Sequence, residues 1–223
     1  MKSDAEDPAS GADYPLKALT RHVEPKVFWR DLTLPQSNLS TLRDICNEFR
    51  NISRFSGDWD YEAGVMNNNI TALFAGPSGN HKAMAAEAIA TDLGIPLYTV
   101  DLSKVVSKYI GETEKNLARV FDAAGGSGAL LFFDEGDALF GERTEVRDSH
   151  DRYANVAVAN LLERIGTYPG IVILATNLNR NLDQTFLRRI RFILDFPVPN
   201  NEERRNIWDK VVRKLRRLLG RPR

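Results

Sequence analysis

The sequence predicts an α/β domain in which a parallel β-sheet lies between two layers of helices. The first observation is that the chain contains five short apolar runs of strand length. The second is that a helical segment separates every consecutive pair of runs except the last, as in parallel strands joined by crossover helices. The third is that the runs are almost continuously apolar, which is typical of strands covered on both faces. The runs are Ile70 to Ala75, Leu97 to Asp101, Ala129 to Phe133, Ile171 to Thr176 and Phe192 to Phe196.

The segments on either side of these runs set the expected domain boundaries. Residues 1–26 mix acidic, small and proline residues without a hydrophobic period, so we expect a disordered arm that orders only on a partner. An amphipathic helix is expected from Asn38, and we place the α/β domain at residues 27–199. Residues 200–223 are expected to form a C-terminal helix, with apolar positions at Ile207, Val211, Leu215 and Leu218.

Composition limits the class of protein and its partners. With 223 residues, 43% of them hydrophobic, the chain can bury the core of one ordinary domain. Thirty basic residues balance thirty acidic ones, which disfavours nucleic acid and anionic membranes as partners. The single cysteine, Cys46, cannot form an internal disulfide, which favours a reducing compartment. No window approaches the roughly 20 apolar residues of a membrane span, so we expect a cytoplasmic protein.

A loop with two glycines joins the first apolar run to an alanine-rich segment of high helix propensity. Such a loop can point successive backbone N–H groups at phosphates at the positive end of a helix, and Lys82 can then reach the terminal phosphates. The alternative is a Gly-Pro turn with an exposed lysine, and the loop alone does not decide between the two. The candidate ligand-binding residues are Gly76, Pro77, Ser78, Gly79, Asn80, His81, Lys82 and Ala83.

Two of these residues depart from the phosphate-loop pattern G-x-x-x-x-G-K-[ST]. His81 stands where the second glycine belongs, and its imidazole either crowds the phosphate path or donates a hydrogen bond to phosphate. Ala83 stands where a hydroxyl normally ligates magnesium, and its methyl group offers no ligand. We therefore expect magnesium-dependent catalysis to be weakened.

Two adjacent carboxylates, Asp134 and Glu135, come directly after the third apolar run. The carboxyl ends of parallel strands share one edge of the sheet, so these carboxylates are expected at the same edge as the glycine loop. There Asp134 could order a magnesium shell and Glu135 could polarise an attacking water, as phosphoryl transfer requires. The alternative interpretation is a solvated strand end.

Several segments, in this order along the chain, resemble the motifs of AAA+ ATPases. The similarity covers roughly Trp29 to Trp208 and is strongest to the classical AAA clade of remodelling ATPases, including bacterial members. It implies a P-loop NTPase fold, a three-layer αβα sandwich whose five-stranded parallel sheet has the order 5-1-4-3-2. The segments are Gly76 to Ala83 for Walker A, Lys108 to Gly111 for the first pore loop, Leu130 to Gly141 for Walker B, Ile173 to Asn177 for sensor one and Phe186 to Phe192 for the arginine finger.

The resemblance also implies roles for individual residues and names the ligands, ATP and Mg²⁺. Lys82 becomes the phosphate ligand, Asp134 the magnesium organiser and Glu135 the general base. Asn177 becomes the group that positions water, although it could simply be a turn residue at a strand end.

Two further groups of residues become interaction sites under the same resemblance. Arg188 and Arg189 would reach the nucleotide of a neighbouring subunit in a homo-oligomeric ring, a hexamer; otherwise they are a basic helix end. The pore loop would grip a polypeptide substrate, whereas its tyrosine could instead pack on the following helix. The pore-loop residues are Lys108, Tyr109, Ile110 and Gly111.

The function that the sequence favours is a ring-forming ATPase that couples ATP hydrolysis to protein remodelling, with catalysis weakened by His81 and Ala83. The alternative is a catalytically degenerate, nucleotide-binding structural subunit of a larger assembly. Family members normally continue into a small helical lid, and residues 200–223 resemble a remnant of that lid. A nucleic-acid motor is disfavoured by the neutral composition.

Overall fold

The structure, a computed structural model, describes residues 19–58, 69–77, 79, 81–106, 111–125, 128–137, 149–177, 184–201, 203–205, 207–210 and 212. Its centre is a six-stranded sheet with the order β1-β3-β4-β5-β2-β6. The strands are β1 (Thr20–Val23), β2 (Ile70–Ala75), β3 (Leu97–Asp101), β4 (Leu130–Asp134), β5 (Ile171–Thr176) and β6 (Phe192–Asp195).

Five of the six strands confirm the sheet expected from the sequence. β3, β4, β5, β2 and β6 pair in parallel, each with its neighbour in the sheet order. Numbered without β1, they give the predicted order 5-1-4-3-2 when the sheet is followed from β6 to β3. β6 adds to the outer side of β2 at one edge, and β3 lies near the other.

The sixth strand corrects the expectation of a disordered arm over residues 1–26. Thr20–Val23 forms β1, which pairs antiparallel with β3 at the edge of the sheet. Its sequence, Thr-Arg-His-Val, carries no apolar period that would predict a strand. Its order comes instead from pairing with the β3 backbone and from contacts such as that of the His22 ring, 5.2 Å from the Tyr98 ring. Residues 1–18 lie outside the described residues, so the expectation for them stays a prediction.

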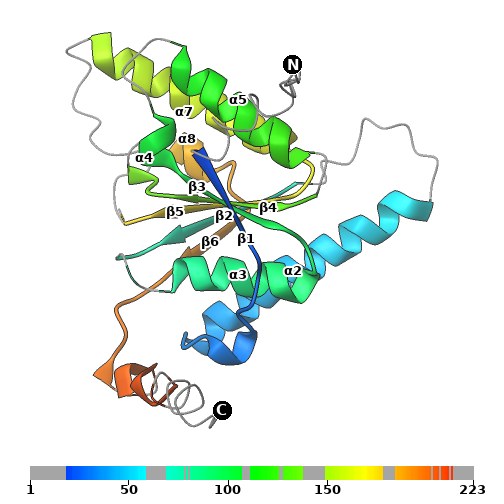
Figure 1. The fold of residues 1–223 in the computed structure, drawn as a ribbon, viewed down its shortest axis with the longest axis vertical. Helices are drawn as coiled ribbons and strands as arrows, with labels where there is room; N and C mark the ends of the chain where they lie inside the picture. The colour runs from blue at the N-terminus through cyan, green and yellow to red at the C-terminus, as the bar shows by residue number, and fades with distance from the viewer. Residues whose placement is uncertain are drawn as a thin grey trace, which may run out of the picture.

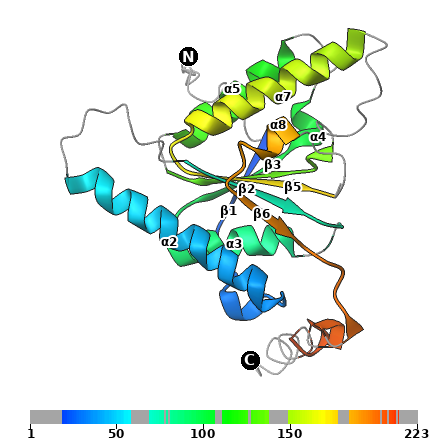
Figure 2. The same cartoon turned by 180° about the vertical axis from the view of Figure 1, so that it is seen from behind.

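Helices cover both faces of the sheet and complete a three-layer sandwich (Figures 1 and 2). α2 (Gln36–Asp58) and α3 (Lys82–Leu93) lie on one face, and a short 3₁₀ turn, η1 (Trp29–Asp31), precedes α2 in the chain. The other face carries α4 (Leu102–Val105), α5 (Glu112–Gly125), α7 (Ser149–Thr167) and α8 (Gln184–Leu187). Among the described helices, none has the length and apolar character needed to cross a membrane, and the expected cytoplasmic location stays a prediction.

The side chains of the central strands point alternately to the two faces of the sheet and form a hydrophobic core on each side. Phe132 of β4 is buried with Leu42, Ile45 and Ile89, which belong to the α2 and α3 layer. The next residue, Phe133, is buried with Leu117 and Leu161 of the α5 and α7 layer. Successive strand side chains point to opposite faces, so a run of apolar residues satisfies both layers at once.

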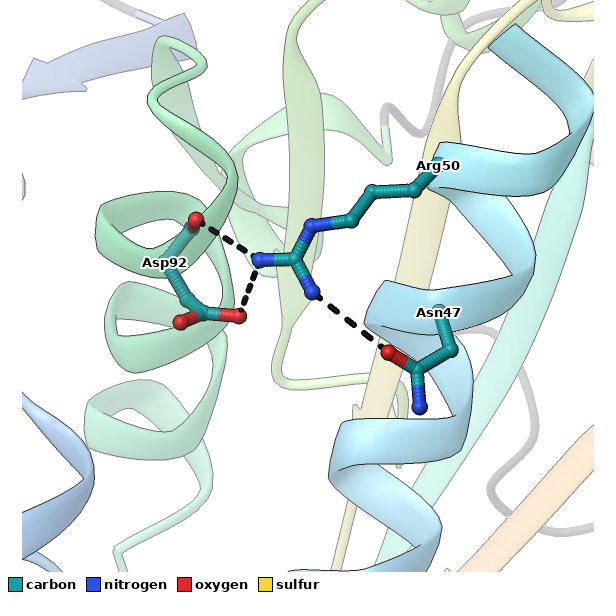
Figure 3. Close-up of polar contacts among 3 residues, drawn as sticks. All are labelled: Asn47, Arg50 and Asp92. Carbon is teal, nitrogen blue, oxygen red and sulfur yellow. Dashed lines mark hydrogen bonds and ion pairs between the residues drawn. The ribbon is translucent and has the colours of Figure 1, made fainter. Parts of the chain in front are cut away.

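A polar clamp fixes the far end of α3 against α2 (Figure 3). The Arg50 Nη2 group donates to the carbonyl oxygen of Asp92 at 3.0 Å and to its Oδ2 at 2.7 Å, and Nη1 donates to Asn47 Oδ1 at 3.5 Å. Burial raises the pKa of Asp92, but hydrogen bonds from Trp29 and Arg50 outweigh it and lower that pKa overall. Arg50 therefore holds the C-terminal turn of the helix whose first residue is Lys82.

The chain leaves β6 and reaches a C-terminal helical segment apart from the sheet (Figure 1). Its start is capped reciprocally: the Glu203 backbone N–H donates to Asn200 Oδ1 at 2.9 Å, and the Asn200 N–H donates to Glu203 Oε2 at 2.8 Å. Residues 201, 203–205, 207–210 and 212 are helical. Lys210 Nζ donates to the Leu32 carbonyl oxygen at 2.7 Å and to Thr33 Oγ1 at 3.1 Å, which joins this segment to the loop before α2.

Candidate functional site

The candidate site lies where the carboxyl ends of β2, β5 and β4 meet. β5 stands between the other two strands, and the last residues of β2 and β5, Ala75 and Thr176, are paired in register. β2 continues into Gly76, β5 into Asn177 and β4 into Glu135. The three predicted motifs are therefore brought to one edge of the sheet, where parallel α/β sheets bind their ligands.

The glycine loop leaves β2 with a backbone that favours glycine. Gly76, Gly79 and His81 have φ values of 140°, 80° and 61°, all in the left-handed half of the Ramachandran plot. Gly76 N–H donates to the Thr176 carbonyl oxygen at 3.1 Å, which ties the start of the loop to β5. α3 then begins at Lys82 without a side-chain N-cap bond, so its first N–H groups offer the anion-binding end of a helix. Ser78 and Asn80 lie outside the described residues.

Lys82 is buried, with 7% of its surface exposed, and its ammonium group points into the loop. Nζ donates to the carbonyl oxygens of Gly76 and, at 3.1 Å, Pro77, and to Asn177 Oδ1 at 3.0 Å. The alternative of an exposed lysine after a Gly-Pro turn is therefore wrong. Burial lowers the pKa of Lys82, and the nearby carboxylates of Asp134, Asp137 and Glu135 oppose that shift.

The acidic pair spans the end of β4: Asp134 is the last residue of the strand, and Glu135 begins a tight turn. Glu135 is exposed and has a φ of 57°, and its backbone N–H donates to Asp134 Oδ1 at 3.0 Å. Gly136 N–H then donates to the Ala175 carbonyl oxygen at 2.9 Å, which fastens the turn to β5. A non-glycine residue in the left-handed region is uncommon. The carboxylates of Asp134 and Glu135 lie close enough to Lys82 to act electrostatically on its ammonium group.

Asp137 lies in the same turn and was not among the site residues predicted from the sequence. Its Oδ1 accepts hydrogen bonds from the Thr176 hydroxyl and, at 3.0 Å, from the Asn177 backbone N–H, and its Oδ2 is 3.3 Å from that same nitrogen. A third acidic residue two positions after Glu135 was the available signal. The residue that it contacts, however, is 40 positions away in the sequence.

The two departures from the phosphate-loop pattern occupy different environments. His81 is half-buried at the N-cap position of α3, and burial lowers the pKa of its imidazole, with a further contribution from the positive charge of Lys210. The C-terminal segment is therefore close enough to act electrostatically on the loop. Ala83 is exposed in the first turn of α3 and places a methyl group where a hydroxyl was expected.

The structure does not bring Arg188 and Arg189 into this site. Both are exposed and precede β6, at the amino ends of the parallel strands. The Arg189 carbonyl oxygen accepts from Thr71 Oγ1 at 3.1 Å, and Thr71 is the second residue of β2. The arginines thus lie at the amino ends of the parallel strands, whereas the loop that follows β2 lies at their carboxyl ends. Of the predicted pore loop, Lys108, Tyr109 and Ile110 lie outside the described residues, and Gly111, with φ 77°, precedes α5.

Comparison with known proteins identifies the family. The profile described as "ATPase family associated with various cellular activities (AAA)" matches residues 72–198, the stretch from β2 to just past β6. The chain belongs to the AAA family of ATPases. An uncharacterized AAA family ATPase of Sinorhizobium fredii, y4kL, is 33% identical over 193 residues, which are 86% of this chain and 55% of that protein.

A second relative and a solved structure are also similar to the chain. The ATP-dependent zinc metalloprotease FtsH 3 of Sphaerobacter thermophilus is 36% identical over 138 residues, 59% of this chain and 28% of that protein. The crystal structure of the FIGL-1 AAA domain superposes with a TM-score of 0.68 at 22% identity, covering 93% of this chain and 69% of that one, which confirms the AAA fold. The chain thus spans only about half, 55%, of the length of y4kL and less of the metalloprotease.

Proposed function

We propose that this AAA domain binds ATP together with Mg²⁺ at the carboxyl edge of the sheet and hydrolyses the terminal phosphate. The observation that carries this proposal is the environment of Lys82. A buried ammonium group at the start of a helix faces loop carbonyls, Asn177 and three nearby carboxylates. In the proposed complex Lys82 exchanges its carbonyl partners for phosphate oxygens, since these carry the greater negative charge.

The oxygen donors at this edge fit a magnesium ion that is shared with the substrate. Mg²⁺ is usually held by one or two protein carboxylates plus phosphates and waters, and Asp134 with Glu135 offers carboxylates in one turn. We assign Asp134 as the protein ligand; when bound, the ion would neutralise developing phosphate charge.

Glu135 and Asn177 would act on the attacking water. Glu135 is exposed at the end of the turn and can accept a proton from a water whose oxygen attacks the γ-phosphorus while the bond to the ADP oxygen breaks. Asn177 lies 3.0 Å from Lys82 Nζ through its Oδ1, so its amide is beside the phosphate ligand and can orient that water. Ala83 contributes no hydroxyl, and we infer weak turnover for that reason.

The position of the arginines supports assembly into a ring. β2 has six residues, which span about 16 Å, so Arg188 and Arg189 at its amino end cannot reach the phosphate loop at its carboxyl end. They can contribute to catalysis only at the site of a neighbouring subunit, in a head-to-tail interface that closes into a ring. A hexamer acting on polypeptide remains the expected assembly, supported by the resemblance of residues 108–111 to a pore loop.

Phosphate release by mixed variants tests both the site and the assembly. Glu135→Gln should bind ATP without turnover, and the double variant Arg188→Ala with Arg189→Ala should lack the neighbour's contribution. Mixing the two should restore turnover, because about a quarter of randomly formed interfaces pair an intact Glu135 with intact arginines. Arg43→Ala, which removes an exposed arginine on α2, serves as the control.

Four results would count against parts of this proposal. Turnover that persists in Glu135→Gln removes the assignment of the base. If the arginine variant turns over ATP as fast as wild type, or if turnover per subunit does not depend on protein concentration, the proposal of a ring is contradicted. Binding of ATP with no turnover in the wild-type chain favours the degenerate structural subunit.

A further inference from the structure

Asp137 joins the turn after β4 to the end of β5 at the point where the proposed catalytic groups stand. Its carboxylate accepts from the Thr176 hydroxyl and from the Asn177 backbone N–H at 3.0 Å. Thr176 is almost completely buried, at 1% exposure, so its hydroxyl needs a partner inside the protein. The pairing thus fixes a buried residue and, through the backbone, the exposed residue that follows it.

These bonds determine where the Asn177 side chain can lie. The amide that donates to Asp137 belongs to the same residue whose Oδ1 accepts from Lys82 Nζ at 3.0 Å. One residue thus receives two constraints, a carboxylate at its backbone and an ammonium group at its side chain. Charge-assisted hydrogen bonds are roughly twice as strong as neutral ones, so both constraints are stiff.

The same contacts also hold Glu135 from its C-terminal side. Glu135 is followed by Gly136, whose N–H donates to the Ala175 carbonyl oxygen at 2.9 Å, and by Asp137, whose partners are the last residue of β5 and the residue after it. Glu135 keeps a left-handed backbone, φ 57°, which costs a non-glycine residue about 1 kcal/mol or more and persists only where its surroundings enforce it. The attachments on β5 supply that enforcement.

We propose that Asp137 is a positioning residue, which fixes Asn177 and Glu135 relative to Lys82 through its bonds to the end of β5. Asp137 does not itself touch the reacting atoms. The inference rests on the proposed function for its kinetic consequences, whereas the restraint on the Asn177 backbone stands on the structure alone. Displacing catalytic groups by an ångström can cost about 100-fold in rate, so a positioning residue is expected to affect kcat rather than ATP affinity.

Kinetics of four variants test this role. Asp137→Ala should lower kcat by about 10- to 100-fold while changing the dissociation constant of ATP by less than about threefold. Asp137→Asn keeps an amide oxygen for the Asn177 N–H, so its kcat should lie between those of the alanine variant and wild type. Asp122→Ala, which removes an exposed carboxylate from α5, should match wild type. In an Asn177→Ala background, Asp137→Ala should cost only about twofold more, because the residue that it positions is already gone.

Hydrogen exchange of the Asn177 amide supplies a readout that needs no activity. The Asn177 amide should exchange slowly in the wild-type chain and fast in Asp137→Ala. The amides of α3 serve as a control and should exchange at the same rate in both chains. The inference is overturned if the Asn177 amide exchanges fast in the wild type or if a hydrolysing Asp137→Ala chain keeps the wild-type kcat. It is also overturned if the effects of Asp137→Ala and Asn177→Ala on kcat are fully additive. If the wild-type chain lacks turnover, the proposed function fails, and the exchange of the Asn177 amide alone decides whether Asp137 positions the end of β5.

Discussion

Replacing Gly76 with alanine is expected to separate the end of β6 from β2 and to destabilise the whole domain. A Cβ atom at this position would lie 2.2 Å from the Phe196 carbonyl oxygen and 3.0 Å from its carbonyl carbon. The Phe196 backbone cannot easily move away, because its N–H donates to the Ala75 carbonyl oxygen at 2.6 Å. Its ring is fully buried, with its centroid 4.9 Å from that of Phe74.

The expected cost can be worked from these contacts. Alanine at the φ of 140° found at Gly76 costs about 1 to 2 kcal/mol in backbone strain. Losing the hydrogen bond between Phe196 and Ala75 costs about 1 kcal/mol, and disturbing the Phe74–Phe196 ring pair about 1 kcal/mol more. We therefore expect a loss of about 3 to 4 kcal/mol, a large part of the roughly 5 to 15 kcal/mol that stabilises an ordinary domain.

Urea unfolding, followed by circular dichroism, measures this loss against a matched control. Gly79 also has a left-handed backbone, φ 80°, but a Cβ there meets nothing within 4 Å. Gly79→Ala should therefore cost only the strain of about 1 to 2 kcal/mol. With a slope of about 2 to 3 kcal/mol per molar urea, the midpoint of Gly76→Ala should fall about 1 M below that of Gly79→Ala. Equal midpoints for the two variants would refute the close approach of β6 to the loop.

Three further predictions follow from the described contacts. His81→Gly should be about 1 kcal/mol more stable than His81→Ala in thermal unfolding, because glycine adopts the left-handed φ of 61° without the strain that alanine has there. Asp92→Asn should lose about 1 kcal/mol at neutral pH, because its carboxylate binds Arg50. The pKa of Asp92 is lowered in the folded state, so its contribution is present above the unfolded pKa and fades as the pH falls through the folded one. Ala83→Thr should raise magnesium-dependent kcat at least about tenfold by restoring a hydroxyl ligand.

Each of these predictions has a control in the same chain. His81→Gly and His81→Ala both lack the imidazole, so equal stabilities would show that the backbone at this position is unstrained. Asp44→Asn alters an exposed carboxylate on α2 and should leave the urea midpoint at neutral pH unchanged, and a loss equal to that of Asp92→Asn would contradict the clamp. Ala83→Val has the shape of threonine without its hydroxyl, so equal activation by both variants would exclude a ligand effect.

The parallel sheet and the meeting of the motifs could be predicted because they depend on local pattern and strand direction. Ile70–Ala75 and Ile171–Thr176 are apolar apart from one threonine each and are buried throughout, and their pairing places Gly76 beside the end of β5. Once five such strands run parallel, their carboxyl ends share an edge, so Lys82 and Asp134 converge whatever lies between them. The sheet order itself came from the family resemblance, since periodicity does not specify it.

Contacts between distant parts of the chain could not be predicted in this way. Thr20–Val23 pairs with β3 through backbone bonds that any sequence can make, so its side chains give no signal of a strand. Lys210 binds Leu32 across 178 positions, and a lysine on a helix face predicts only exposure. In the sequence, Asp137 is one more acidic residue in a charged stretch. Only the structure reveals its partner at the end of β5.

Affinity for ATP in the wild-type chain and in Lys82→Ala, measured by isothermal titration calorimetry in the presence of Mg²⁺, tests the central claim most directly. Lys104→Ala, which removes an exposed lysine from α4, is the control. The account predicts that the wild-type and Lys104→Ala chains bind ATP alike, and that Lys82→Ala binds it at least about tenfold more weakly. ATP binding of equal strength in all three chains, or no binding in the folded wild type, would contradict the assignment of this edge of the sheet as a nucleotide site.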